Sequence, residues 1–307
     1  MDIAPPYALP RLRRNQDRRG THRHLSRPTE GLDEHWTTID GVEVFYRSAP
    51  GPPGAPVMTH LHGFGLSGRY LLPTAQALAG DFRTFVPDLP GFGRSGDPPR
   101  PPGLPELARE AADFLTDRGV ARSTLVGNSL GCTVVCEFAH QFPDRVDRAI
   151  LVSPAGGPFN QPLRRAVRQL LSDSLREPPR LLRVAVPDYL RFGVSSTLRL
   201  FEAITRYPTL DRLLDLSVPT LVVVGNCDPL LPEEGTIVQV ARDHLHDSIV
   251  VVVLEGAAHA VNFSHPEELA TLIRRFMADL PLELPNEPGG ARAYEIYRGE
   301  GMPRPAP

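Results

Sequence analysis

Three short segments of the chain carry side chains suited to nucleophilic catalysis. The motif Gly-Asn-Ser-Leu-Gly at 127–131 places Ser129 between small residues, after the apolar run 123–126 and before a stretch with helical spacing. A strand followed at once by a helix forms a tight turn that projects such a serine above the sheet. Because a serine hydroxyl is a poor nucleophile at neutral pH, it needs a base and a group that orients the base.

Suitable partners for Ser129 follow two later apolar runs. Asp228 comes after the run 221–224, and His259 comes after the run 249–254. If these runs are parallel strands, all three side chains leave the same edge of the sheet, and the chain order Ser, Asp, His is typical of a nucleophile at such a turn. We therefore predict Ser129 as nucleophile, His259 as general base and Asp228 as the carboxylate that orients the histidine. Activity is expected to rise with pH through a base pKa near ~7.

Attack on a carbonyl also requires hydrogen-bond donors for the developing oxyanion. The glycine-rich turn His-Gly-Phe-Gly at 62–65 follows the apolar run 57–61. We predict that the main-chain N–H groups of Phe64 and Leu130 form the oxyanion hole, because one lies in this turn and the other directly follows the nucleophile. The imidazole of His62 is predicted to brace the turn through a hydrogen bond rather than to take part in chemistry.

Two other residues could fill the same roles. His265 lies close to His259 in sequence but is predicted to begin the following helix. Asp88 is the main alternative acid, yet it opens a segment rich in glycine and proline, 88–96, which is typical of a structural loop.

The elements that must position these residues are predicted from short apolar or β-branched runs bounded by Gly, Pro or Asp. These runs are 42–46, 57–61, 84–86, 123–126, 149–152, 221–224 and 249–254. Amphipathic helical patterns between the later runs indicate a mainly parallel sheet covered on both faces. The run 42–46 is predicted to pair with residues 36–39 as a hairpin through Asp40-Gly41.

The alternation of strand and helix patterns stops for about sixty residues, where short helical patterns punctuated by prolines occur instead. A structureless loop of that length is uncommon in a compact domain. We therefore predict a helical cap at 156–216, inserted into a core formed by 34–155 and 217–280. Residues 1–33, rich in Arg, Pro and His, are predicted to be a disordered basic arm, and residues 281–307 an irregular C-terminal tail.

Composition narrows the class of protein further. The 307 residues carry a formal net charge of -3, which gives no reason to expect binding to nucleic acid. No apolar run approaches the ~20 residues of a membrane-spanning helix. The three cysteines are odd in number and have no metal-ligand spacing, which favours reduced thiols and a cytoplasmic location. The oligomeric state is not readable from the sequence.

The chain resembles the α/β-hydrolase superfamily over residues 36–280. The resemblance rests on five features that occur in that family's order: the turn at 62–65, the segment 88–96, the motif at 127–131, Asp228 and His259. The resemblance implies an α/β fold with a mostly parallel eight-stranded sheet, flanking helices, an inserted cap, and no metal or organic cofactor. Members with a serine nucleophile include carboxylesterases, lipases, thioesterases, lactonases, proline iminopeptidases and C–C bond hydrolases of ring-fission dienones.

The predicted function is that of a serine hydrolase that cleaves a small, largely apolar carbonyl substrate, with a carboxylic ester the first choice. A C–C bond hydrolase is an alternative, because those enzymes share Asn128 before the serine. Against it, they commonly have a tryptophan after the catalytic histidine, where this chain has Ala260. A non-catalytic ligand receptor of the same fold is another alternative. Two Gly-x-Gly-x-x-Gly matches, at 63–68 and 91–96, could instead indicate a dinucleotide site, but that reading leaves the three triad residues unexplained.

The predicted cap contains two groups of residues that could contact a substrate. Its apolar side chains favour an apolar or aromatic substrate, and its arginines could bind a carboxylate, although most are expected to be solvated. The apolar group is Leu170, Leu171, Leu190, Phe192, Leu200, Phe201 and Ile204, and the arginines include Arg164, Arg165, Arg168, Arg183 and Arg191.

Overall fold

A nine-stranded sheet forms the centre of the molecule. The computed structural model describes residues 31–193, 200, 202–244, 248–284 and 291–299. The strand order is β1-β2-β4-β3-β5-β6-β7-β8-β9, and the six strands from β4 to β8 in this order are parallel, with antiparallel pairings at both ends. The strands are β1 (Asp33–Ile39), β2 (Val42–Ala49), β3 (Val57–Leu61), β4 (Arg83–Pro87), β5 (Ser123–Asn128), β6 (Val146–Val152), β7 (Thr220–Gly225), β8 (Ile249–Leu254) and β9 (Ala293–Arg298).

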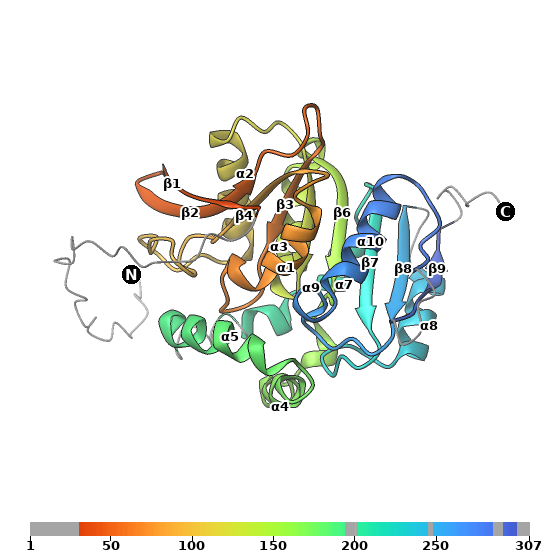
Figure 1. Cartoon of the computed structure of the whole chain (residues 1–307). Coiled ribbons are helices and arrows are strands. Elements are labelled where there is room, and N and C mark those ends of the chain that lie inside the picture. Colours follow the sequence, from red (N-terminus) through yellow and green to blue (C-terminus); the bar gives the residue numbers. More distant parts are fainter. Residues whose placement is uncertain (1–30, 194–199, 201, 245–247, 285–290, 300–307) are drawn as a thin grey trace, which may run out of the picture.

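Helices cover both faces of this sheet, as Figure 1 shows. One face packs against α1 (Leu72–Leu78) and α10 (Pro266–Met277), and the other against α2 (Leu104–Asp117), α3 (Leu130–Gln141) and α8 (Glu234–His244). Side chains of a strand alternate between the two cores, so a strand buried on both sides must be apolar throughout. This explains the unbroken apolar runs in the sequence: all residues of β7 and β8 are buried.

The antiparallel end of the sheet begins with the predicted hairpin. Ile39 of β1 pairs with Val42 of β2, and the two residues between them, Asp40 and Gly41, both have positive φ, 48° and 80°. Positive φ at both central positions is the geometry of the tight turns that best match the twist of paired strands. The hairpin prediction is therefore confirmed.

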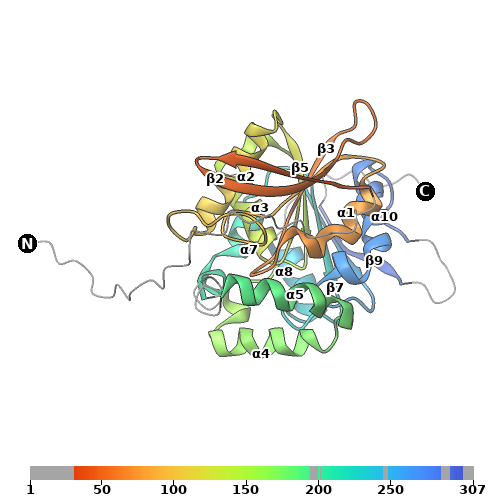
Figure 2. The same ribbon diagram turned by 60° about the vertical axis from the view of Figure 1, so that its left-hand side comes forward.

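The segment between β6 and β7 is helical, as far as it is described. It contains η3 (Pro158–Asn160), α4 (Leu163–Ser174), α5 (Pro179–Phe192), a helical stretch at 202–206, and α7 (Thr209–Leu214). Figures 1 and 2 both show α4 and α5 lying beyond the carboxyl ends of the parallel strands. We refer to α4 and α5 as the cap helices. Their position places them over the edge at which the candidate catalytic residues emerge.

The α/β-hydrolase fold predicted from the sequence is confirmed, with two differences at its margins. The sheet has nine strands rather than eight, because residues 293–298 of the tail predicted to be irregular form β9 on the outer side of β8. Without β9, the apolar strand β8 would lie at the edge of the sheet with unpaired N–H and C=O groups, and β9 pairs with these groups. At the other end, the buried Leu32 and the first residue of β1, Asp33, lie within the predicted arm of 1–33.

Some predicted segments lie outside the described residues: 1–30 of the arm, 194–199 and Phe201 of the cap, and 285–290 and 300–307 of the tail. Within the described part of the chain, no helix is both long and apolar enough to cross a membrane.

Candidate active site

Ser129 sits in a strained turn between a strand and a helix. Strand β5 ends at Asn128, helix α3 begins at Leu130, and Ser129 between them has φ 56° and ψ -118°. A non-glycine residue with positive φ costs on the order of 1–3 kcal/mol and persists only where the surrounding packing imposes it. Ser129 is also partly exposed, whereas both of its neighbours are buried. The turn therefore presents one hydroxyl at the carboxyl edge of the sheet.

The two glycines of the motif allow the chain to pack closely around this turn. A Cβ atom added at Gly127 would lie 2.4 Å from the carbonyl oxygen of Gly131, and one added at Gly131 would lie 2.1 Å from the carbonyl oxygen of Leu61. Both contacts are to backbone atoms, which cannot rotate away. The small residues that flank the serine are therefore required by the approach of β5, α3 and β3.

This close packing leads to a paired stability prediction. Gly131→Ala should destabilise the protein by about 1–3 kcal/mol or more, because the new methyl group collides with the end of β3. Gly235→Ala is the matched control: Gly235 also lies in a helix, α8, but a Cβ there meets no atom within 4 Å. This control should stabilise by about 0.5–1 kcal/mol through helix propensity. Urea denaturation measures both, and a stable Gly131→Ala variant would contradict the close approach.

Asp228 and His259 form a buried hydrogen-bonded pair. His259 Nδ1 lies 2.7 Å from Asp228 Oδ2, and both side chains are almost fully buried. The second oxygen, Asp228 Oδ1, accepts from the N–H of Leu230 at 2.8 Å, which fixes the carboxylate in the loop after β7. This arrangement favours the proton on Nδ1 and leaves Nε2 as the basic nitrogen. His259 Nε2 is buried and has no hydrogen-bond partner among the described residues.

A network of side chains joins the loop of His259 to the turn of Ser129. The side-chain amide of Asn128 donates to the carbonyl oxygens of His259 and Val152, both at 3.1 Å. Its oxygen accepts from the hydroxyl of Tyr70 at 2.8 Å, and that hydroxyl accepts from the N–H of Gly63 at 2.7 Å. Asn128 thus connects three loops at the edge of the sheet. Neither Asn128 nor Tyr70 was predicted to have this role, and nothing in the local sequence indicates such distant contacts.

The glycine-rich turn at 62–65 lies directly beside Ser129. A Cβ added at Gly63 would be 3.4 Å from the Cβ of Ser129. His62 braces the turn as predicted: Nδ1 donates to the carbonyl oxygen of Gly63 and Nε2 accepts from the N–H of Leu89, both at 3.0 Å. Burial lowers the pKa of His62, so both contacts are made by the neutral ring. The turn therefore has the location needed to present donors to an oxyanion at Ser129.

A cluster of aromatic rings fixes this turn to a cap helix. The ring centroid of Phe64 lies 6.2 Å from that of Tyr189 and 6.3 Å from that of Phe192, both on α5. Phe192 also stacks on Phe92 at 4.7 Å. A Cβ at Gly65, where φ is 65°, would lie only 2.6 Å from the ring of Tyr189, so glycine is needed there. The surroundings of the predicted oxyanion donors are accordingly aromatic and apolar.

The electrostatic surroundings of His259 are dominated by acids. Burial by itself would lower the pKa of His259, but the charge of Asp228, the hydrogen bond to it, and the charges of Asp173 and Glu177 together raise this pKa to about 9. The sequence alone suggested a value near ~7. The additional carboxylates come from α4 and the residues after it, a source that the sequence did not reveal.

The rival acid has a structural role. Asp88 Oδ1 accepts from the N–H of Gly68 and Oδ2 from the N–H of Arg94, both at 2.8 Å. Asp88 is buried, and its Oδ1 lies 3.8 Å from the guanidinium of Arg47. Both carboxylate oxygens are thus used to hold the loop after β4. The other rival, His265, contacts Ser264 at 3.0 Å and lies at the start of α10.

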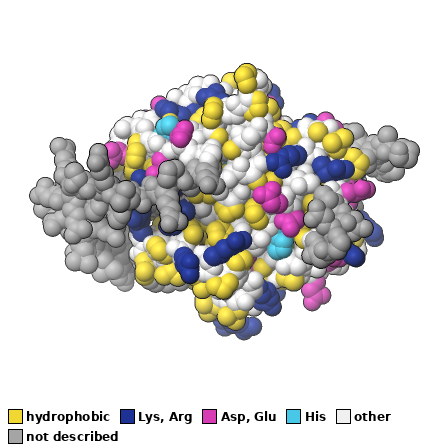
Figure 3. All heavy atoms as spheres, in the orientation of Figure 1, with side chains coloured by type: hydrophobic (Ala, Val, Ile, Leu, Met, Phe, Trp, Pro, Cys, Tyr) yellow, Lys and Arg dark blue, Asp and Glu magenta, His cyan; other side chains and the backbone are white. Residues whose placement is uncertain are grey.

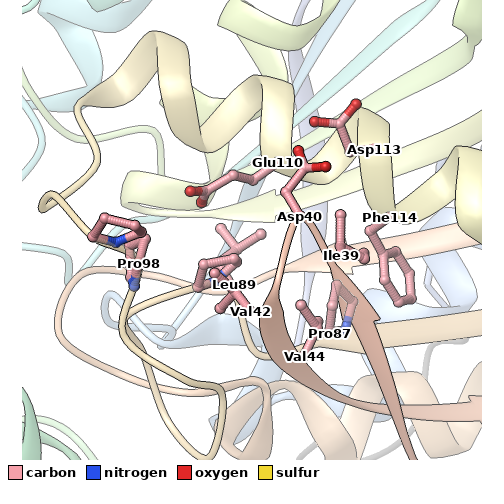
Figure 4. Close-up of a pocket in the computed structure, with 12 residues that line it drawn as sticks. Ile39, Asp40, Val42, Val44, Pro87, Leu89, Pro98, Glu110, Asp113 and Phe114 are labelled. Atoms are coloured by element: carbon pink, nitrogen blue, oxygen red, sulfur yellow. The ribbon is translucent and has the colours of Figure 1, made fainter.

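A separate cavity of about 280 Å³ lies away from these residues. Figure 4 shows it between the β1–β2 turn, the loop after β4 and helix α2, with Glu110 and Asp113 near an apolar floor that includes Leu89 and Phe114. None of Ser129, Asp228 and His259 lines it. This cavity is therefore not part of the candidate active site.

The outer surface of the cap helices carries most of the cap residues singled out from the sequence. Figure 3 shows basic and hydrophobic side chains side by side on the lower part of the molecule, where α4 and α5 lie in Figure 1. The five arginines named above are exposed, as are Leu171 and Leu190, whereas Ile204 is buried and Leu170 and Phe192 are half-buried. Among the described residues, no group of three or more His, Cys, Asp or Glu side chains is arranged to hold a metal ion.

Comparison with known proteins identifies the family. Residues 60–272, more than half of the chain, match the model of the alpha/beta hydrolase family. The chain is a member of that family. A pimeloyl-[acyl-carrier protein] methyl ester esterase of Aeromonas hydrophila is 29% identical, over 72% of this chain and 95% of the relative. A poly(3-hydroxyalkanoate) depolymerase of Ectopseudomonas oleovorans is 28% identical, over 63% of this chain and 76% of the relative.

Solved structures agree with this membership. The crystal structure of a membrane phospholipase A, described as a bacterial virulence factor, superposes with a TM-score of 0.70 at 26% identity, over 81% of this chain and 87% of that chain. The two relatives named above are hydrolases, an esterase and a depolymerase. The present alpha/beta hydrolase is therefore an enzyme, carboxylesterase-like, and the prediction of an enzyme rather than a receptor is confirmed.

Proposed function

We propose that this alpha/beta hydrolase cleaves carboxylic esters through an acyl-enzyme on Ser129, with His259 as general base and Asp228 as its orienting carboxylate. The observation that carries the proposal is the 2.7 Å contact between Asp228 and His259, in a loop that Asn128 ties to the turn of the nucleophile. Acyl transfer requires an acid–imidazole pair to act on a serine, and here a buried pair lies in a loop that is hydrogen-bonded to the residue before a strained serine.

In the first half-reaction, His259 Nε2 takes the proton of Ser129 Oγ as the oxygen attacks the ester carbonyl. The carbonyl oxygen becomes an oxyanion, for which we propose the N–H groups of Phe64 and Leu130 as donors. The imidazolium, stabilised by Asp228, then protonates the leaving alkoxide, and the alcohol departs. Water repeats the sequence: His259 deprotonates it, it attacks the acyl carbon, and Ser129 recovers the proton as the acid is released.

The proposed substrate is a small, largely apolar ester. Support comes from the aromatic cluster of Phe64, Tyr189 and Phe192 next to the proposed oxyanion donors, since apolar walls with few polar groups are typical of ligand sites. The name of one relative, a pimeloyl-[acyl-carrier protein] methyl ester esterase, supports an ester as the substrate class.

Covalent labelling tests the proposal directly. A fluorophosphonate probe should modify Ser129 stoichiometrically, as shown by mass spectrometry of the peptide that contains it, and should abolish hydrolysis of p-nitrophenyl esters. The substrate panel should include thioesters, lactones and a ring-fission dienone, and short or medium acyl esters should be turned over fastest. Faster cleavage of the dienone would instead favour the C–C hydrolase. A folded protein that neither reacts with the probe nor cleaves any ester would overturn the proposal.

A further inference from the structure

Two buried carboxylates from the cap reach the loop that carries His259. Asp173 Oδ1 accepts from the N–H of His259 at 3.2 Å, and Glu177 Oε1 accepts from the N–H of Ala260 at 2.6 Å. Asp173 is 5% exposed and Glu177 is 7% exposed, although most residues around them are exposed. Acidic side chains are rarely buried to this extent unless they are paired. Here no lysine or arginine pairs with either at salt-bridge distance in the described part of the chain.

The local fold explains why both side chains face the same loop. Asp173 lies in the last turn of α4, and the carbonyl oxygen of Asp173 accepts from the N–H groups of Arg176 and Glu177, so one further helical turn follows. Residues four apart in a helical path share a face. The exposed Leu175 and Arg176 lie on the outside of this turn, while the two acids point inward.

We infer that Asp173 and Glu177 are positioning residues of the catalytic centre. They hold the loop of His259 by accepting hydrogen bonds from consecutive main-chain N–H groups, and their negative charge sets the pH range in which the imidazole can act as a base. The inference rests on the proposed role of His259 as the base. It makes the cap part of the catalytic apparatus and not only a cover.

The charges in this part of the site support the second half of the inference. Burial, opposed by the hydrogen bond from the N–H of Ala260 and assisted by the nearby charge of Asp173, raises the pKa of Glu177 to about 7. Burial also raises the pKa of Asp173. Near pH 9, where His259 titrates, Glu177 is therefore ionised and stabilises the imidazolium. The N–H of Ala260 donates to Glu177 Oε1, whereas Oε2 is buried without a hydrogen-bond partner among the described residues, so no second donor at Oε2 offsets the charge.

The other groups near the two acids do not remove their effect. Burial raises the pKa of both Tyr70 and Tyr189, so these phenols are neutral throughout the relevant range. Arg176 is exposed and lowers the pKa of Asp173, which favours the charged form of that acid. The groups that act on His259 are therefore three carboxylates, of which Asp228 is the one in direct contact with the ring.

Amide and alanine substitutions separate the two parts of the role. Asp173→Asn and Glu177→Gln keep an oxygen that accepts from the loop but remove the charge, so each should lower the pKa of His259 by about one pH unit, since a tenfold change in proton affinity is one unit. The rate at pH 8, relative to the plateau at high pH, should then rise by about threefold or more. The gain at pH 7 should be smaller for Glu177→Gln, because Glu177 is already partly protonated there in the wild type. Asp173→Ala and Glu177→Ala remove the acceptor as well, and should lower the plateau of kcat with little change in KM.

The decisive measurement is the NMR titration of the His259 ring in the wild type and in the two amide variants, with its signal assigned by its loss in His259→Gln. Asp211→Asn is the matched control, because Asp211 is an exposed carboxylate of α7, and the His259 titration should not move. An unchanged His259 pKa in both amide variants would overturn the inference, as would alanine variants with full activity. The titration needs no turnover, so it is independent of the labelling of Ser129 that tests the proposed function.

Discussion

Ser129→Ala should reduce kcat/KM for ester hydrolysis by a factor on the order of 10⁴ or more, and should abolish reaction with a fluorophosphonate. No neighbouring side chain can replace the nucleophile, because the turn presents a single hydroxyl at the edge of the sheet. Any rate that remains would come from substrate binding and the oxyanion donors acting on water. The measurement is kcat/KM for the best p-nitrophenyl ester, with active-site titration of the wild type.

The fold of this variant should be intact, since alanine removes one oxygen and leaves the positive φ to be imposed by the same packing. Ser174→Ala provides a matched control: Ser174 is an exposed serine of α4 whose hydroxyl donates to the carbonyl oxygen of Leu170. It should retain wild-type kinetics. Undiminished hydrolysis by Ser129→Ala, in a preparation free of contaminating esterase, would remove the nucleophile from the proposal.

The features that could be predicted from the sequence are those with a short-range signal. The strand β7 is an apolar run with both faces buried, so its composition alone indicates a parallel strand in the middle of a sheet. The Asp40-Gly41 turn and the glycines around Ser129 are likewise specified by backbone conformations or close approaches that few other residues permit. Once the strands are placed, the positions of Asp228 and His259 at their carboxyl ends follow from parallel topology.

The features that could not be predicted depend on contacts between distant segments. Asp173 and Glu177 look like ordinary acids on an amphipathic helix, and only the docking of α4 against the loop of His259 buries them. In the same way, the hydroxyl of Tyr70 reaches Asn128, 58 positions away in the sequence. No periodicity or motif encodes such pairs. Their effect is substantial, because the cap acids help to move the pKa of His259 from the ordinary range to about 9.

The tail illustrates a different limit. Residues 293–298 contain two tyrosines and an isoleucine, a composition compatible with a strand, but prolines and glycines on both sides favour a loop. Whether such a segment forms a strand depends on the availability of an unpaired edge. Strand β8 supplies that edge, and the register from Val250 to Leu254 is filled by β9. Local propensity was overruled by tertiary pairing.

Asp228→Asn should lower kcat/KM by about 10³ to 10⁴ while leaving the protein folded. The amide can still accept from the N–H of Leu230 through its oxygen, but the group that faces His259 Nδ1 becomes a donor. Nδ1 must then be the unprotonated nitrogen, and the proton moves to Nε2, the atom that has to accept the proton of Ser129. The variant also loses the carboxylate that stabilises the imidazolium.

This effect differs from that of the cap acids in a way that kinetics can resolve. Glu177→Gln removes a charge that does not contact the ring, so it shifts the acid limb of the pH profile and preserves the plateau of kcat/KM. Asp228→Asn lowers the plateau itself, because the proton of His259 then lies on Nε2 instead of Nδ1. Measuring kcat/KM from pH 6 to 10 for both variants therefore separates orientation of the base from tuning of its pKa. If Asp228→Asn kept its plateau and only shifted along the pH axis, the carboxylate would act through its charge alone, and the orienting role would have to be abandoned.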